Sequence, residues 1–176
     1  MPQQKEAIAA EIPRLRRYAR ALTGADAEAD DLVQETLARA LSRIDQWQTG
    51  ESPRKWLFSI LHNLHVDTLR RSARRPQHLS IDATEFAPAA VGNDLGTRRD
   101  LDNGLQALSP EHRQVLLLIG LEGLSYAEAA DVLDVPIGTI MSRLARARER
   151  LRLLMQCDIG EADAPPGVVT TLRRVK

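Results

Sequence analysis

Hydroxyl and guanidinium side chains recur along one side of a helical segment near the C-terminus. Thr139 and Ser142 stand near the start of this segment. Arg143, Arg146 and Arg150 follow at steps of three or four residues, which place side chains on one face of a helix. Arginines bind phosphates and guanine, and hydroxyls bind bases or phosphates in the major groove. This face therefore predicts a helix that reads double-stranded DNA.

A second helix and a tight turn precede this face. Ser125 and Glu128 form a capping-box pattern, which predicts a helix start. Residues 134–136 end that helix, and Pro136 suits the first turn of the next one. The pattern is typical of a helix-turn-helix, but it also fits an ordinary helical hairpin whose basic face is only solvated. The buried stripe of the second helix is predicted at Ile137, Ile140, Leu144, Ala147, Leu151 and Leu154.

The composition favours helices with small aliphatic cores. The chain has 176 residues, of which 43% are hydrophobic and 3% aromatic. Its 24 basic and 24 acidic residues cancel, which argues against a DNA-binding protein that acts alone. The charges are segregated, because residues 26–35 hold five acids and no base, and residues 70–75 hold four arginines and no acid. Segregated patches indicate different surfaces for different partners.

Neither a membrane span nor a catalytic centre is expected from the sequence. No run of about eighteen apolar residues occurs, and the N-terminus lacks a secretory signal pattern, so a cytoplasmic protein is expected. The single cysteine, Cys157, fits a reducing compartment. His62 and His65 have no further ligand at suitable spacing, which indicates surface histidines rather than a metal site. Without a phosphate-binding loop, the sequence predicts a protein that is not an enzyme and needs no cofactor.

Two amphipathic helices are predicted at the start of the chain. The first is expected to become regular near Pro13 and to end at Gly24. Its arginines are either solvated or paired with the acidic helix that follows. That second helix covers about residues 26–44 with a 3.6-residue apolar period. Acids in its first turn complement the helix dipole, but this reason does not extend to Gln34 and Glu35.

A third helix carries an amide and arginines on its outer face. Ser52 as N-cap and Pro53 as first helical residue predict its start. Asn63 lies amid its outer face, and Arg70 and Arg71 follow about two turns later. A side-chain amide can read a base edge while arginines hold phosphates, although an exposed Asn is also commonly only solvated.

A segment without periodicity divides the chain. Residues 76–96 contain two prolines and two glycines, which predict a flexible linker. A flexible chain of this length spans roughly 25 Å. Beyond it, a helix with Leu101, Leu105 and Leu108 and another that starts at Ser109 precede the helix-turn-helix. The expected divisions are residues 1–75, the linker, residues 97–155 and a loose tail over residues 156–176.

Three blocks of sequence follow one another in a specific order. They are EADDLVQETLARAL from Glu28, WLFSILHNLHVDTLRR from Trp56, and a segment from Leu108 that includes LSPEHRQVLLL and GLSYAEAADVLDVPIGTIMSRLARARERL. Together they resemble the extracytoplasmic-function (ECF) sigma factors of bacterial RNA polymerase, over roughly residues 13–154 apart from the linker. The resemblance implies an all-α protein of two small helical domains, sigma-2 and sigma-4, joined by a flexible linker, with the helix-turn-helix in sigma-4.

The resemblance also implies a function and partners. Such proteins bind core RNA polymerase, direct it to promoter DNA by recognising −35 and −10 elements, and aid strand opening. ECF relatives are usually held inactive by an anti-sigma factor, and a role in stress response is implied. The zero net charge fits this role, because polymerase supplies much of the affinity for DNA.

Three interaction surfaces follow from the resemblance. In the family, the DLVQE helix docks on the clamp helices of the largest catalytic subunit. The family's Asn, here Asn63, lies beside a loop expected to hold a flipped-out base, to which residues 46–52 contribute. The implied residues are Asp30, Asp31, Leu32, Gln34 and Glu35 for polymerase, Asn63, Asp67, Arg70, Arg71 and Arg74 for the −10 element, and Thr139, Met141, Ser142, Arg143 and Arg146 for the −35 element.

Departures from the family pattern and competing functions remain. Met141 stands where many relatives have a basic residue, and Ala145 where a larger side chain can occur, so the −35 sequence stays open. A sigma-like decoy that binds an anti-sigma factor without touching DNA is one alternative, but Asn63 and the arginines disfavour it. A dimeric repressor with one helix-turn-helix is another, and the block around Asn63 disfavours it too.

Overall fold

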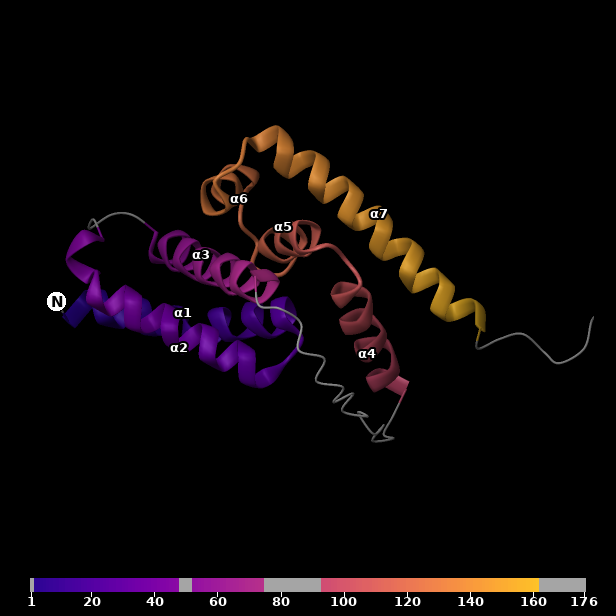
Figure 1. Cartoon of the computed structure of the whole chain (residues 1–176), viewed down its shortest axis with the longest axis horizontal. Coiled ribbons are helices and arrows are strands. Elements are labelled where there is room, and N and C mark those ends of the chain that lie inside the picture. The colour runs from indigo at the N-terminus through magenta and orange to yellow at the C-terminus, as the bar shows by residue number, and fades with distance from the viewer. Residues whose placement is uncertain (1, 48–51, 75–92, 162–176) are drawn as a thin grey trace, which may run out of the picture.

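The computed structural model describes residues 2–47, 52–74 and 93–161, which form helices and no strands (Figure 1). Side chains at residues 73–74, 93–98 and 156–161 are outside the described part. The all-α prediction is confirmed. The elements are α1 (Pro2–Thr23), α2 (Asp26–Ser42), a 3-10 turn η1 (Ile44–Gln46), α3 (Pro53–Arg74), α4 (Asn93–Gln106), α5 (Pro110–Gly120), α6 (Tyr126–Leu133) and α7 (Ile137–Glu161).

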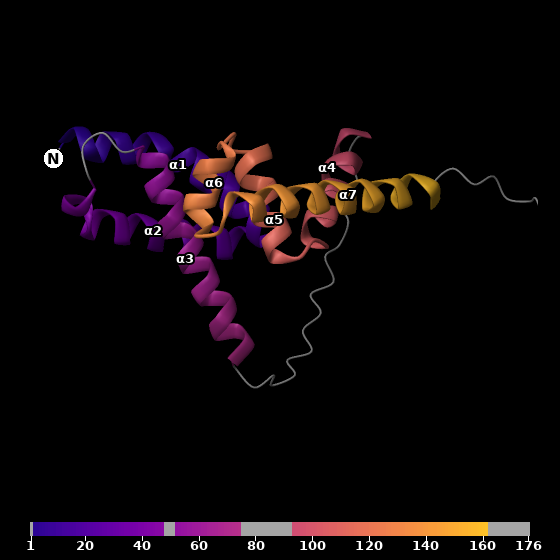
Figure 2. The same cartoon turned by 90° about the horizontal axis from the view of Figure 1, so that it is seen from above.

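The first half of the molecule is a bundle of α1, α2 and α3, seen from a second side in Figure 2. Tyr18 of α1 and Phe58 of α3 are fully buried, and their rings meet edge to face at 5.0 Å, a favourable aromatic arrangement. Thr36 of α2 is also buried, and its hydroxyl donates to the carbonyl of Leu32 at 2.7 Å, which satisfies the polar group. The core also includes Leu15, Leu22, Leu57 and Leu61.

The start of α1 differs from the prediction. The sequence places the first regular turn near Pro13, but α1 begins at Pro2 and Pro13 lies inside it. Proline has no N–H, so one helical hydrogen bond is lost there. The earlier turns are held by packing instead, because Ile8 is only 3% exposed and belongs to the core. The predicted end is confirmed, since Gly24 follows the helix with a φ of +76°.

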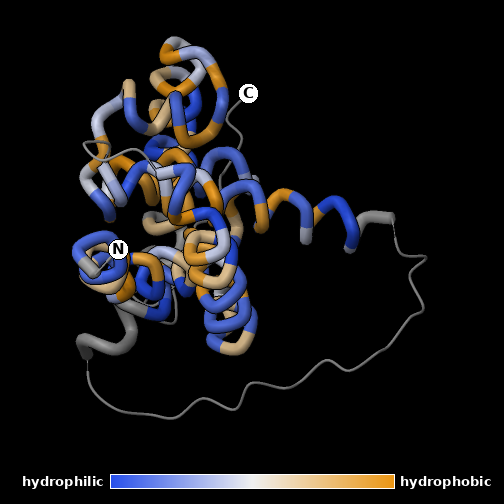
Figure 3. The backbone as a smooth tube through the Cα atoms, turned by 90° about the vertical axis from the view of Figure 1, so that its left-hand side faces the viewer, coloured by the Kyte–Doolittle hydropathy of each residue, from blue (hydrophilic) through white to orange (hydrophobic). Residues whose placement is uncertain are grey.

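The second half consists of α4 to α7. Ser109 caps α5, and its hydroxyl accepts from the backbone N–H of His112. At α6 both bonds of the predicted capping box between Ser125 and Glu128 are present. Asp134 then adopts a left-handed conformation that turns the chain into α7. Buried positions recur on each helix, and hydrophobic and hydrophilic residues alternate along the tube in Figure 3.

Three features of the second half differ from the predictions. The buried stripe of α7 is predicted to include Ile137, but this side chain is 47% exposed. The helix α4 begins at Asn93, inside the predicted linker, because Asn and Asp suit a helix start as well as a loop. The helix α7 continues to Glu161, inside the predicted tail, because no proline interrupts it.

The two halves pack against each other. Helix α6 lies over α3, and both α4 and α5 contact α1 (Figure 1). Two groups of side chains join them. The first comprises the ion pairs Arg17–Glu122 and Lys55–Asp131, and the second comprises the hydrogen bonds of Arg113, one of which reaches the carbonyl of Leu22. We call this region the interdomain contact.

Candidate polymerase and DNA interfaces

The predicted polymerase surface lies on the outer side of α2. Asp31, Gln34 and Glu35 are exposed, and Asp30 is half-buried. Leu32 is only 9% exposed, so it serves mainly the core of the bundle. The structure therefore brings the three exposed polar residues together on one helix and leaves the leucine beneath them.

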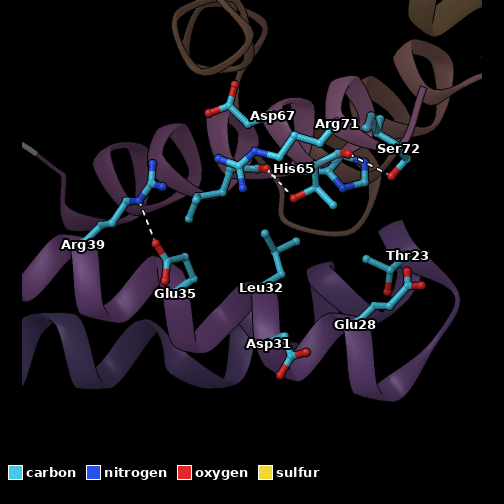
Figure 4. A pocket seen from close by; sticks show the side chains of 13 residues that line it. Thr23, Glu28, Asp31, Leu32, Glu35, Arg39, His65, Asp67, Arg71 and Ser72 are labelled. Atoms are coloured by element: carbon cyan, nitrogen blue, oxygen red, sulfur yellow. Dashed lines mark hydrogen bonds and ion pairs between the residues drawn. The ribbon is translucent and has the colours of Figure 1, made fainter. Parts of the chain in front are cut away.

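A cavity of about 540 Å³ opens between α2 and the second half of α3 (Figure 4). Asp31 and Glu35 of α2 border it, and Glu35 pairs with Arg39 at 2.9 Å. From α3, Asp67 and Arg71 border the same cavity. Residues assigned separately to polymerase and to the −10 element thus share one hollow. Sequence reasoning missed further lining residues, among them Arg39, His65, Thr68 and Ser72.

The predicted −10 surface follows the outer side of α3. Asn63 and Arg70 are exposed, and Asp67 between them is half-buried. Their spacing of three and four residues places them on one helix face. The side chain of Arg74 lies outside the described residues, as do residues 48–51 of the predicted base pocket.

Two tryptophans anchor the predicted base-pocket loop. Trp47 is 8% exposed, and its ring stacks on that of Trp56 with centroids 6.1 Å apart and an interplanar angle of 13°. The sequence places Trp47 in a polar loop before α3. A stacked pair fixes the point where the chain leaves η1 and the start of α3, so it positions both ends of the loop.

The predicted −35 surface lies on α7. Met141, Ser142 and Arg146 are exposed, whereas Thr139 and Arg143 are half-buried. The Ser142 hydroxyl donates to the carbonyl of Thr139 at 3.0 Å within the helix. The charge of Arg143 also lowers the pKa of His62 on α3, in the first half of the molecule.

The sequence predicts surface histidines on α3, but the structure shows them less exposed than that. His62 and His65 are both half-buried. Burial, first of all, lowers the pKa of each imidazole, and that of His65 falls to about 4. The charge of Arg143 lowers the pKa of His62 further, and His62 and Arg113 do the same for His65. Both imidazoles therefore favour their neutral form.

Acid should therefore weaken the folded state through these histidines. Because their pKa lies below the ordinary value of 6.5, their contribution to the free energy of unfolding is complete above pH 6.5. It falls as the pH drops toward about 4, the pKa of His65. We expect the variant His65→Gln to lose less stability than the parent between pH 6.5 and 4, as measured by urea unfolding. A pH slope in His65→Gln equal to that of the parent protein would contradict this assignment.

Ion pairs join the halves across long sequence distances. Arg17 of α1 approaches the carboxylate of Glu122 at 3.0 Å, and the Glu122 side chain is 0% exposed. Arg17 also donates to the carbonyl of Leu121 at 3.2 Å. Lys55 of α3 meets Asp131 of α6 at 2.8 Å, in a more exposed setting. Sequence reasoning had left Arg17 solvated or paired with α2, and the structure assigns it to the second half.

Arg113 of α5 forms a hub beside these pairs. Its guanidinium donates to the carbonyls of Leu22 at 2.7 Å and Leu105 at 2.8 Å. It also donates to the backbone and side-chain oxygens of Gln106, both at 2.6 Å, and to the carbonyl of Leu108 at 3.1 Å. The last turn of α1 is thereby tied to the turn between α4 and α5.

Within the described ranges, no three His, Cys, Asp or Glu side chains come close enough together to hold a metal ion. None of the described helices is both long and apolar enough to cross a membrane. Cys157 lies in α7, but its side chain is outside the described residues.

An acidic helix, a helix with an outward amide and arginines, and a helix-turn-helix define a two-part helical DNA-binding protein. The Sigma2 domain of PhyR family matches residues 8–62, and the Sigma-70, region 4 family matches residues 98–151. The ECF RNA polymerase sigma factor EcfG of Rhodopseudomonas palustris is 36% identical over 166 residues, which cover 94% of this chain and 92% of the relative. The chain belongs to the ECF sigma factor family, and it is a transcription initiation factor.

Solved structures agree with this assignment. The sigma factor RpoE of Bartonella quintana, in complex with the anti-sigma factor NepR, is 34% identical with a TM-score of 0.76, covering 90% of this chain and 99% of that one. The anti-anti-sigma factor PhyR of the same organism, complexed with NepR, is 22% identical with a TM-score of 0.55, covering 91% of this chain and 51% of that one. The second likeness shows the fold alone. Sigma factors bind core RNA polymerase and promoter DNA and are not enzymes.

Proposed function

We propose that this sigma factor uses three helices for three contacts. The exposed acids of α2 bind core RNA polymerase, the outer face of α3 binds and helps to open the −10 element, and α7 reads the −35 element. The observation that carries the proposal is that α7, the second helix of a capped helix-turn-helix, exposes Ser142 and Arg146. In the first half, Glu35 of α2 and Arg71 of α3 line one cavity. The sigma-2 part then covers α1 to α3, and the sigma-4 part covers α4 to α7.

Reconstituted transcription tests the proposal. The purified chain with core polymerase should give transcripts from a promoter that transcript-start mapping defines after overexpression of the chain. Neither the chain nor core polymerase alone should do so. If the complete holoenzyme assembles but starts at no promoter of the genome of origin, the proposed reading of DNA fails.

Arg146 should contribute to duplex binding. If it pairs with a base, Arg146→Ala weakens binding of the −35 duplex by the holoenzyme by about 1–3 kcal/mol. Arg148→Ala is the matched control, because this exposed arginine is two residues away and points to another side of α7. Equal losses in both variants, measured by competition between labelled duplexes, would show a general charge effect instead of a base contact.

Asn63 should act later than Arg146. A flipped base costs a few kcal/mol, which contacts in a pocket must offset. Asn63→Ala should therefore reduce strand opening, followed by permanganate reactivity of unpaired thymines, more than it reduces duplex binding. Asn103→Ala, an exposed asparagine on α4, serves as the control. A premelted promoter should restore activity to the variant.

The family also supports an inhibitory partner and a site of action. We propose that an anti-sigma factor binds this chain, because the similar RpoE is solved in complex with NepR. We further propose that the chain acts in the cytoplasm, where transcription takes place, and has no catalytic activity of its own. The decoy alternative is favoured by the PhyR match of the first half. Retained anti-sigma binding with no transcription from any promoter would support that alternative.

A further inference from the structure

Apolar side chains form a line on the outside of α7. Ile137 is 47% exposed and Met141 is 52% exposed. Ala145, one turn beyond, is exposed as well. Residues four apart lie above one another on a helix, so the three side chains form a continuous line. The helix-turn-helix thus presents to solvent, beside its polar face, large side chains that ordinary helix packing would bury.

This line runs beside the polar side chains of the same helix. Ser142 follows Met141 directly, and Arg146 follows Ala145. Between Ile137 and Met141, Gly138 has no atom within 4 Å of the position that a Cβ would occupy. The first turn of α7 is therefore unobstructed at Gly138, and another molecule can approach its backbone closely there. A molecule that approaches the start of α7 closely and contacts Ser142 and Arg146 therefore also contacts Met141.

We propose that Met141, supported by Ile137, recognises the C5-methyl groups of thymines in the −35 element. Thymine is the base that carries a methyl group in the major groove, and apolar side chains contact it there. The inference rests on the proposed reading of the −35 element by α7. The inference names thymine as the base that the apolar side of the helix selects. The positive charge of the arginines alone does not distinguish thymine from the other bases.

The surroundings of the line favour DNA over a protein helix as its occupant. Arg146 and Arg150 are exposed along the same helix and complement phosphates. A stable protein interface buries about 800 Å² on each partner, which exceeds what two side chains and an alanine offer. A pair of methyl groups in the groove matches a patch of this size.

Deoxyuridine substitution tests the proposal, because uracil lacks only the methyl group of thymine. The full-length chain is assembled with core polymerase, and each −35 thymine is replaced singly in the promoter duplex. Loss of one methyl contact is worth about 0.8 kcal/mol, so the parent holoenzyme should bind about fourfold more weakly at one or two positions. The Met141→Ala holoenzyme should bind thymine DNA about as weakly as the parent holoenzyme binds uracil DNA. It should show no further loss of affinity when uracil stands at those positions.

Two control variants separate the possible failures. Leu153→Ala removes another exposed apolar side chain of α7 and should keep the parent's sensitivity to uracil. Arg146→Ala should bind all duplexes more weakly but keep the same ratio between thymine and uracil DNA.

A parent holoenzyme that binds the −35 duplex but ignores every uracil overturns the thymine contact and leaves the proposed function intact. If the holoenzyme forms and the −35 duplex is not bound at all, the proposed function itself fails. Unchanged DNA binding by Met141→Ala, with weaker anti-sigma binding, assigns the line to a protein partner and overturns the proposal.

Discussion

Replacing Glu122 with lysine should separate the two halves of this sigma factor. The carboxylate has no exposed surface, and Arg17 supplies its ion pair at 3.0 Å. A lysine would place a second positive charge beside Arg17. Breaking a buried pair costs about 3–5 kcal/mol; because Arg17 is 53% exposed, we expect the low end of this range. The radius of gyration in X-ray scattering should increase, while helix content in circular dichroism stays the same.

A charge swap provides the decisive comparison. Arg17→Glu combined with Glu122→Arg should recover part of the compactness that either single change loses, because it restores an ion pair across the same contact. Glu149→Lys is the matched control, since Glu149 pairs with Arg152 on the exposed surface of α7. An unchanged radius in Glu122→Lys would contradict the assignment. If helix content falls instead, the milder Glu122→Gln carries the test.

Removing Arg113 should have the second large effect. Its guanidinium is half-buried and satisfies carbonyl oxygens from both halves of the molecule. Hydrogen bonds to charged groups contribute roughly 1.5–3 kcal/mol each, and members of one network do not add fully. We expect Arg113→Ala to lower the free energy of unfolding by about 3 kcal/mol, measured in urea. The carbonyl of Leu22 at the end of α1 would lose its partner in the second half.

The lysine variant tests geometry against charge. Arg113→Lys keeps the positive charge but lacks the planar fork that reaches several oxygens at once. It should recover less than half of the stability that Arg113→Ala loses. Arg148→Ala, at an exposed site on α7, should change the free energy of unfolding by less than about 0.5 kcal/mol. Full recovery by lysine would show that the charge, and not the hydrogen-bond network, supports the fold.

Helix starts with local signals were predictable from the sequence. The capping box of Ser125 and Glu128 and the Ser109 cap involve residues three apart, so the pattern itself contains both partners. Helix extent was harder to predict where a breaker residue is tolerated. Pro13 was read as a start because the cost of an interior proline is visible in sequence, whereas the packing of Ile8 that offsets it is not.

The interaction surfaces divide in the same way. Exposure of Glu35, Asn63 and Arg146 followed from helical periodicity and is observed. The partner of Arg17 could not be predicted, because 105 residues separate it from Glu122. The lowered pKa values of the half-buried histidines are also tertiary properties, since burial and the charges of Arg143 and Arg113 in the second half cause them. Periodicity gives the face of a helix, and tertiary packing decides what that face meets.

The interdomain contact has a consequence for promoter geometry. Elements at −35 and −10 lie about 25 base pairs apart, roughly 85 Å at 3.4 Å per pair. Helices α3 and α7 have 22 and 25 residues, so even laid end to end they measure only roughly 70 Å at 1.5 Å per residue. If α3 and α7 contact these elements as proposed, the arrangement in which Lys55 pairs with Asp131 reaches only one element at a time. Under this proposal, core polymerase sets the promoter spacing by holding the two halves apart, because the free protein is too short to span both elements.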